Sequence, residues 1–354
     1  MDIKTIGIDI GKNKFHAYGV DDQGKRVLRQ QFTRQKLYEF MANLKPCLVG
    51  IEACSGAHHL ARIFKEMGHS VRLMAIQHVK PYMPAYKNDF NDAAGICEAV
   101  GRPHMKFVSI KTIAQQDLLA IHKDRSRLVS ERTALANEIR GLLLEYGITI
   151  PQGISKIIPL VTELLDPEAQ EVTGNLKELL VDMIEDFKHK DKLIKKREAS
   201  LKGLSKFNSQ VQQLMSIPGI GTIVATALVG KVGDVNVFKN GRQLAAWLGL
   251  VPSQYTTGGK VQLGRISKRG DRYLRALLVH GGRSVLYALK RRQKESLPPL
   301  LKWLKNVAER RGHNKGIVAF ANKLARVSWA ILAHGGEYQE NYKKPSSYKE
   351  SYAA

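Results

Sequence analysis

The first 33 residues contain three short runs typical of β-strands, and their arrangement constrains the fold more than any other feature. The runs are KTIGIDIG, KFHAYGVD and RVLRQQFT, and the turn sequences GKN and DDQGK separate them. Helix-like and strand-like segments then alternate to about residue 110. Hairpin-connected strands followed by alternating helices and strands predict a mixed α/β sheet.

Beyond residue 110 the sequence is mainly helical. Residues 111–205 carry apolar residues at helical spacing in two long stretches separated by a break at Pro151. This pattern predicts an antiparallel coiled-coil hairpin, which either spaces two domains or forms a dimer contact. The chain is then basic and Gly-rich with short helical segments. We therefore expect an α/β domain (1–110), a helical linker (111–205), a mainly helical domain (206–336) and a polar tail (337–354).

The charge of the chain points to a polyanionic partner. The sequence has 56 lysines and arginines against 32 aspartates and glutamates, a formal net charge of +24. Residues 239–329 hold 20 of these basic residues and 3 of the acidic ones, a local excess of 17. Solvated surfaces usually mix both signs, so this segment is expected to bind nucleic acid or an anionic membrane.

The apolar pattern weakens the membrane alternative. No run of 18 or more apolar residues exists, and the N-terminus lacks the regions of a signal peptide. The 3 cysteines and 11 histidines form no disulfide framework and no zinc-ligand spacing. We therefore expect a reduced, cytoplasmic protein whose partner is nucleic acid.

Four acidic residues of the first domain stand where carboxylates need compensation. Asp9 lies within an apolar strand, Glu52 ends another apolar run, and Asp89 and Asp92 begin a helix three residues apart, on one face. Buried carboxylates are rare unless a cation or metal compensates them. Acids at strand ends and on a helix suit two divalent cations about 4 Å apart, with Mg²⁺ favoured by hard oxygen ligands. The structural alternatives are an N-cap role for Asp92 and an ion pair of Glu52 with Arg62 or Lys65.

Two segments of the second half are candidates for phosphate contact. IPGIG (217–221) is a helix-hairpin-helix-like element in which Gly219 and Gly221 let the backbone approach a phosphate, or it is a plain turn between helices. The segment QYTTGGKVQLGRISKRGD (254–271) combines hydroxyls with cations and is either a phosphate-binding element or a solvated loop. The cations expected to contact phosphates are Lys260, Arg265, Lys268, Arg269 and Arg272.

Both halves of the chain resemble one protein family, the DEDD transposases of insertion sequences. Three motifs look like those that carry the family's four acids: GIDIGKNKFH with Asp9, GIEACSG with Glu52, and KNDFNDA with Asp89 and Asp92. The sequence from SIPGIG to LLVHGG resembles the family's C-terminal domain nearly end to end. The likeness covers about residues 4–335, and the family is similar to the Piv-type DNA invertases.

The resemblance implies a fold and a chemistry. It implies a RuvC-like (ribonuclease H-like) first domain whose four acids hold Mg²⁺, in a transposase that cuts and rejoins DNA strands to mobilise its insertion sequence. In the family, a serine before a glycine of the second domain attacks DNA and forms a covalent phosphate link. The matching position here is Thr257, a departure whose hydroxyl has the same chemistry with more crowding at Cβ. Ser267 is the alternative nucleophile.

The resemblance also implies partners. Family members are directed to donor and target DNA by a structured RNA encoded within the element. A basic protein with no recognisable base-reading motif is compatible with such a guide. Assembly as a homodimer or homotetramer, with the helical hairpin contributing, is implied in the same way.

Two rival functions are compatible with the residues. A Holliday-junction endonuclease of the RuvC class needs only the acids and hydrolyses DNA with water. A non-catalytic nucleic-acid scaffold uses the acids structurally. Loss of cleavage in Asp9→Asn separates an enzyme from the scaffold, and loss of a covalent protein–DNA link in Thr257→Ala separates the transposase from the endonuclease.

Overall fold

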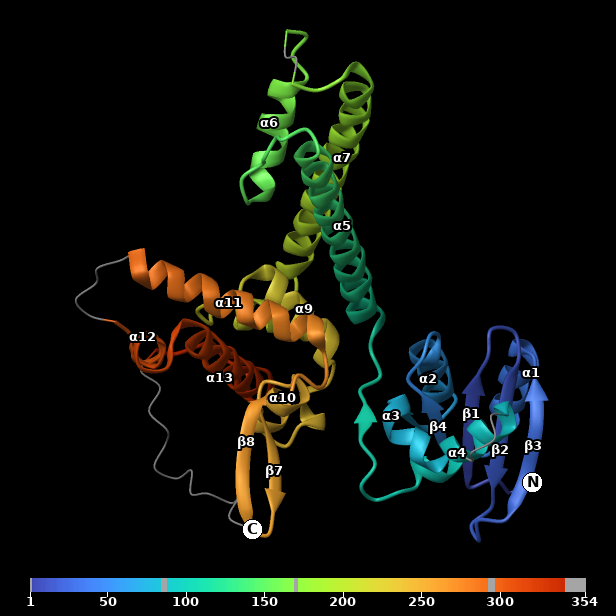
Figure 1. Ribbon diagram of the computed structural model, residues 1–354. Helices are drawn as coiled ribbons and strands as arrows, with labels where there is room; N and C mark the ends of the chain where they lie inside the picture. Colours follow the sequence, from blue (N-terminus) through green and yellow to red (C-terminus); the bar gives the residue numbers. More distant parts are fainter. Residues whose placement is uncertain (1, 84–87, 169–170, 292–296, 341–354) are drawn as a thin grey trace. The chain divides into compact units, whose positions relative to one another are not determined.

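The computed structural model describes residues 2–83, 88–168, 171–291 and 297–340 (Figure 1). Residues 341–354 of the predicted tail lie outside this part of the chain. Two compact units are present. Unit 1 comprises residues 1–112 and 232–237, and unit 2 comprises residues 113–231 and 238–354.

Unit 1 is built on a mixed six-stranded sheet with the strand order β3-β2-β1-β4-β5-β6. The first three strands are antiparallel, β1, β4 and β5 run parallel, and β6 closes the edge antiparallel to β5. The mixed α/β sheet predicted from the sequence is therefore confirmed. The strands are β1 (Thr5–Ile10), β2 (Phe15–Val20), β3 (Arg26–Phe32), β4 (Leu48–Glu52), β5 (Ser70–Met74) and β6 (Phe107–Val108).

One face of this sheet forms the larger core of the unit. Alternate strand residues such as Ile8 and Ile51 are fully buried there. Two helices cover them, α1 (Arg34–Asn43) and α2 (Ala57–Glu66), which bury Leu37 and Phe64. Period-two burial on one face is the physical origin of the strand pattern in the sequence.

The other face carries α4 (Asp89–Val100), which packs on β1, β2 and β4. The helix lies close because Gly7 and Gly50, register partners on β1 and β4, carry no side chains. A Cβ atom on Gly7 would overlap the α4 backbone, and one on Gly50 would lie 2.8 Å from Val100 Cβ. The connection before α4 contains α3 (Ile76–Val79) and η1 (Lys80–Tyr82), and η3 (Val235–Val237) also belongs to unit 1.

Unit 2 begins with two long helices, α5 (Ile113–Leu144) and α7 (Gly174–Ser205), which pack along each other (Figure 1). Ion pairs join them at Arg125–Glu198 (2.6 Å) and Arg132–Asp191. Residues later in α5 thus pair with residues earlier in α7, so the two helices are antiparallel, as expected for a hairpin.

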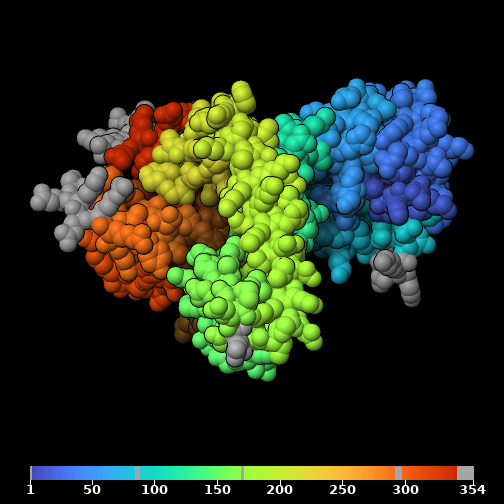
Figure 2. Space-filling model, turned by 90° about the horizontal axis from the view of Figure 1, so that it is seen from above, coloured from blue at the N-terminus to red at the C-terminus, as the bar shows by residue number. Residues whose placement is uncertain are grey.

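The far end of this hairpin holds a helix that the sequence patterns did not predict. The helix α6 (Ile157–Leu164) follows η2 (Ile154–Lys156) and packs against α7, as the green segments in Figure 2 show. It buries Ile157 and Val161 in a cluster with Leu143 and Phe187. Pro151 lies in the non-helical segment between α5 and α6, so the helical stretch is interrupted there, as predicted.

The rest of unit 2 is mainly helical, again as predicted. The long helix α13 (His313–His334) packs against α8, α10, α11 and α12. By length and composition α13 is apolar enough to cross a membrane, but it buries Phe320 and Leu324 among these helices, as a core helix does. The others are α8 (Ser209–Met215), α9 (Thr222–Val232), α10 (Gly241–Trp247), α11 (Arg272–Arg291) and α12 (Pro299–Arg311).

A two-stranded β-hairpin interrupts these helices. The strands β7 (Pro252–Thr257) and β8 (Lys260–Ile266) pair antiparallel and are exposed along almost their whole length. The sequence predicts a phosphate-binding element or a solvated loop here, and the structure shows a β-hairpin. The hairpin carries several of the predicted functional residues.

Candidate active site

The fold of unit 1 brings the four predicted acids to one end of the sheet. Asp9 and Glu52 follow Gly7 and Gly50 by two residues on β1 and β4, so their side chains lie on the face covered by α4. Asp89 and Asp92 occupy the first turn of α4. The paired glycines therefore place the start of α4 beside the carboxyl ends of two neighbouring strands.

The carboxylates affect one another electrostatically. Burial raises the pKa of Asp9, and the negative charges of Asp92 and Asp89 raise it further. Burial also raises the pKa of Glu52, with further contributions from Asp9 and Asp92. The protein thus gathers negative charge in a partly desolvated place, which costs free energy unless a cation compensates it.

The two structural alternatives for these acids do not hold. Asn88, not Asp92, is the N-cap of α4, and its side chain accepts from the backbone N–H of Phe90 at 2.9 Å. Arg62 donates to the Lys111 carbonyl at 2.6 Å. Among the described residues, neither Arg62 nor Lys65 forms an ion pair with Glu52.

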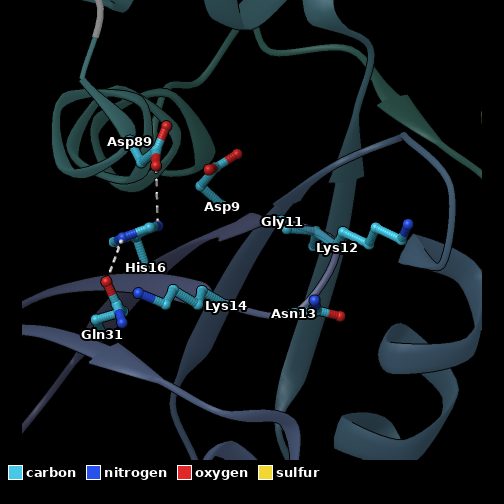
Figure 3. Close-up of a pocket in the computed structure, with 9 residues that line it drawn as sticks. Asp9, Gly11, Lys12, Asn13, Lys14, His16, Gln31 and Asp89 are labelled. Atoms are coloured by element: carbon cyan, nitrogen blue, oxygen red, sulfur yellow. Dashed lines mark hydrogen bonds and ion pairs between the residues drawn. The ribbon is translucent and has the colours of Figure 1, made fainter.

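A hollow of about 600 Å³ opens beside Asp9 and Asp89. Figure 3 shows Asp89 pointing toward the ring of His16, with Asp9 beside them and Gln31 on the far side of the ring. The loop between β1 and β2 forms another wall of the hollow and contributes Lys12, Asn13 and Lys14. An anionic substrate would meet these cations at the rim of the acidic site.

The four acids do not form a complete set of metal ligands in this structure. Within the described ranges, no three His, Cys, Asp or Glu side chains stand in a group that could hold a metal ion. The four carboxylates share an electrostatic environment without forming such a group.

The hairpin of unit 2 presents Thr257 at its tip. Thr257 and Lys260 are register partners on either side of Gly258 and Gly259. Both glycines have positive φ (56° and 75°), as a two-residue type I′ turn requires. The side chains of Thr257 and Lys260 are exposed.

The base of the hairpin is fixed to the short segment between α10 and β7. The backbone N–H groups of Ser267 and Lys268 donate to the carbonyls of Val251 (2.8 Å) and Gly249 (3.1 Å). Ser267 is half-buried, whereas the cations around it are exposed. Four of the predicted cations follow the hairpin from β8 to the start of α11: Arg265, Lys268, Arg269 and Arg272.

The IPGIG segment is a tight turn between α8 and α9. Gly219 has φ +93°, and a Cβ there would lie 3.0 Å from Val285 Cγ2 and 3.2 Å from the Gly281 carbonyl of α11. Gly219 therefore allows helix packing as well as a left-handed turn. A Cβ on Gly221 would meet nothing within 4 Å, so the structure gives Gly221 no packing role.

Two parts of this chain match known transposase families. Residues 211–297 match the transposase family named IS116/IS110/IS902, and residues 6–148 match the DEDD transposase domain of the IS110 type. The chain is 43% identical to the transposase for insertion sequence element IS1111A of Coxiella burnetii, over 97% of this chain and 92% of the relative. It is 41% identical to a probable family 20 transposase of Pseudomonas aeruginosa, over 94% of this chain and 98% of the relative.

The chain belongs to the IS110 family of DEDD transposases.

This transposase therefore acts on DNA in the transposition of an insertion sequence. A third relative, the transposase for IS1328 of Yersinia enterocolitica, is 40% identical over 94% of this chain and 98% of its own length. Since the matches extend over both units, they include the acids of unit 1 and the hairpin of unit 2.

Two features of the candidate site do not follow from the sequence patterns described above. The hairpin could have been predicted, because Gly-Gly between YTT and KVQ is a strong signal for a two-residue turn. His16 and Gln31 carried no metal-ligand spacing and were not singled out. Only the strand register shows that they lie in a row with Asp9.

Proposed function

We propose that this transposase breaks and rejoins DNA strands with two sets of residues: the four acids of unit 1 and the Thr257 hydroxyl of unit 2. The observation that carries this proposal is that the fold brings the four acids to one end of the sheet of unit 1, where the charges of Asp92 and Asp89 raise the pKa of Asp9. Proteins concentrate uncompensated carboxylates in this way mainly at functional sites.

Divalent metal binding fits the chemistry of the acids. Asp9, Glu52, Asp89 and Asp92 would hold one or two Mg²⁺ ions, because carboxylate oxygens are the ligands Mg²⁺ prefers. When bound, the ions supply positive charge that stabilises the phosphate during strand cleavage. A cation also offsets the repulsion that raises the pKa values of Asp9 and Glu52.

The sheet order of unit 1 supports a RuvC-like fold. Three antiparallel strands are followed by the parallel strands β4 and β5, and acids end β1 and β4. This order is the one implied by the resemblance to ribonuclease H-like domains, and it accounts for the position of the acids.

Thr257 is the proposed nucleophile. In the reaction, its Oγ1 forms a bond to a DNA phosphorus, and the bond from that phosphorus to a deoxyribose oxygen breaks. The hydroxyl proton is lost, and the departing oxygen takes up a proton. Exposure beside the two-glycine turn at the hairpin tip favours Thr257 over Ser267, whose side chain is half-buried at the hairpin base.

The basic residues of unit 2 provide the surface for DNA. Beyond the hairpin cations, α11 presents an exposed stripe of Arg272, Arg283, Tyr287 and Arg291, opposite buried residues such as Leu278. The stripe is about 28 Å long at 1.5 Å per residue. Contacts of this kind bind the phosphate backbone and position the duplex without reading its sequence.

The proposal also covers how the DNA sequence is selected and how the protein assembles into an oligomer. A structured RNA encoded by the element would select the DNA, and the net charge of +24 suits binding of two nucleic acids. A homodimer or homotetramer would form through the α5–α7 hairpin. Exposed apolar residues near its far end support such a contact: Leu144, Tyr146, Leu179 and Val181.

A covalent-adduct assay tests the chemistry. The wild type with Mg²⁺, DNA of the element ends and the element RNA should give a protein–DNA band that survives denaturing electrophoresis. Thr257→Ala should abolish this band, Thr257→Ser should retain it, and Ser267→Ala is the matched control. Cleavage by Thr257→Ala without an adduct would instead indicate a hydrolytic endonuclease. Binding without cleavage by the wild type would indicate a scaffold.

A further inference from the structure

A row of three polar side chains crosses the sheet of unit 1 beside the acids. His16 is the register partner of Asp9 across β1 and β2, and Gln31 is the partner of His16 across β2 and β3. Cross-strand partners project from the same face of a sheet. Asp9, His16 and Gln31 therefore lie side by side on the face covered by α4.

The ring of His16 is held in one orientation. The residue is only 7% exposed, and its Nε2 lies 3.2 Å from Gln31 Oε1. The Phe90 ring packs against it in a T-shaped contact with 4.7 Å between the ring centroids. Arg29 in turn stacks over Phe90 at 4.5 Å. These contacts restrict rotation of the imidazole.

The other ring nitrogen has no hydrogen-bond partner among the residues that the structure describes. His16 Nδ1 is buried and lies 3.7 Å from Asp89 Oδ2, which is beyond hydrogen-bond distance. A buried polar atom without a partner costs free energy, so its retention calls for a functional reason. The direction of Nδ1 indicates what this reason is, because Figure 3 shows Nδ1 facing the Asp89 carboxylate across a short gap.

Gln31 allows Nδ1 to act as a donor. The Gln31 amide can turn so that its NH₂ group donates to Nε2, and the neutral ring then carries its proton on Nδ1. The Asp89 side chain is 63% exposed and is otherwise free to sample several rotamers in solvent. A donor fixed behind it would restrict that freedom.

We propose that His16 is a positioning residue: its Nδ1–H donates a hydrogen bond to Asp89 and holds this carboxylate in the orientation that binds a divalent cation. This role rests on the proposed metal site and adds a specific residue to it. Gln31 orients the ring, and the orphaned Nδ1 gains its partner when Asp89 turns toward the ion. Outer-shell donors of this kind commonly change metal affinity 10- to 100-fold.

The test measures Mn²⁺ affinity of the full-length protein by calorimetry or by the electron paramagnetic resonance of free Mn²⁺. His16→Asn places an amide nitrogen near the position of Nδ1, whereas His16→Gln places it near Nε2. We expect His16→Gln to weaken Mn²⁺ binding about 10-fold or more. His16→Asn should stay within a few-fold of the wild type. The exposed His59→Gln is the matched control and should change nothing.

Other outcomes separate the two claims. If Asp9→Asn weakens Mn²⁺ binding but His16→Gln and His16→Asn both bind like the wild type, His16 has no positioning role and the metal site stands. If Asp9→Asn leaves affinity unchanged, the proposed metal site fails and the role of His16 fails with it. Equal losses in both His16 variants would indicate a merely structural ring. Should either His16 variant fail to fold, Gln31→Leu serves instead and should lower the affinity several-fold, whereas wild-type affinity in it would overturn the proposal.

Discussion

Gly7 and Gly50 are paired on neighbouring parallel strands, and α4 crosses the sheet over both. The absence of two side chains is thus what brings Asp89 and Asp92, at the start of α4, beside Asp9 and Glu52. Small residues in a strand commonly mark such a close approach.

Gly7→Ala should therefore destabilise unit 1. The added Cβ would overlap backbone atoms of Ala93 and Cys97, which cannot move aside as a flexible side chain could. We expect a loss of about 3 kcal/mol in the free energy of unfolding, measured by chemical denaturation. Gly101→Ala is the control, since a Cβ there meets nothing within 4 Å and should change stability by less than about 0.5 kcal/mol. A Gly7→Ala protein as stable as the wild type would contradict the packing described for α4.

Asp9→Asn should remove the destabilising effect that the ionised Asp9 side chain has on the metal-free wild type. Because the folded pKa of Asp9 is raised above its ordinary value of 3.8, its ionisation lowers stability as the pH rises through and above that value. At pH 7 without divalent ions, the variant should melt at the same temperature as the wild type or higher. Added Mg²⁺ should raise the melting temperature of the wild type and leave the variant unchanged. A variant less stable than the wild type in metal-free buffer would mean that Asp9 is a structural residue.

His122 should make the stability of unit 2 depend on pH. It is 2% exposed, with Nε2 2.9 Å from Thr226 Oγ1 and Nδ1 3.0 Å from the Tyr273 hydroxyl. The Thr226 hydroxyl donates to the Thr222 carbonyl, so it accepts from Nε2–H, and in the neutral ring Nδ1 accepts from the Tyr273 hydroxyl. Burial, followed by the charges of Arg125 and Lys231, lowers the pKa of His122 to about 4.

Stability should fall as the pH falls, because the unfolded state binds the proton of His122 more readily than the folded state. The unfolded chain protonates this histidine near pH 6.5, whereas the folded protein resists protonation until about pH 4. The wild type should thus lose about 2 kcal/mol by pH 5 and about 3 kcal/mol by pH 4 relative to pH 8. In His122→Gln this contribution should be absent, and His59→Gln should keep it. Identical pH profiles for the wild type and His122→Gln would refute the assignment.

The α11 stripe should determine how DNA binding depends on salt. Replacing Arg272, Arg283 and Arg291 together by Gln removes three cations from one helix face. The slope of log K against log salt concentration should become shallower by about 2 to 3, at about 0.9 per phosphate contact. Fluorescence anisotropy with duplex DNA measures this slope. Lys188, Lys192 and Lys196, exposed on α7, provide a control triple variant of equal charge, and an equal change in that control would show that only net charge matters.

Local patterns were sufficient to predict most of unit 1. The strands β1 to β5 follow from short apolar runs bounded by turn residues, and the ends of β1 and β4 placed Asp9 and Glu52 together. Burial on one or both faces leaves a direct mark on the sequence in such strands. The start of α4 at Asp89 was less clear, because Asn88 rather than Asp92 provides the cap.

The features that depend on pairing between distant segments could not be predicted in this way. The neighbours of His16 depend on the register set by the turn at Gly11, whose N–H donates to the Lys14 carbonyl at 3.0 Å. A one-residue shift would turn His16 to the opposite face of the sheet. The helix α6 is short and gains its stability from a cluster with α5 and α7, so its own sequence gave little signal.

The most direct test of the account is strand cleavage by Asp9→Asn. Wild type and variant would be incubated with element-end DNA, the element RNA and Mg²⁺, and nicked or cut strands counted on a denaturing gel alongside a binding assay. We predict that the variant binds DNA as the wild type does but cuts it at least 100-fold more slowly, about the scale of losing a main electrostatic contribution to catalysis. Cleavage by Asp9→Asn at the wild-type rate would contradict the proposal that these carboxylates form the active site.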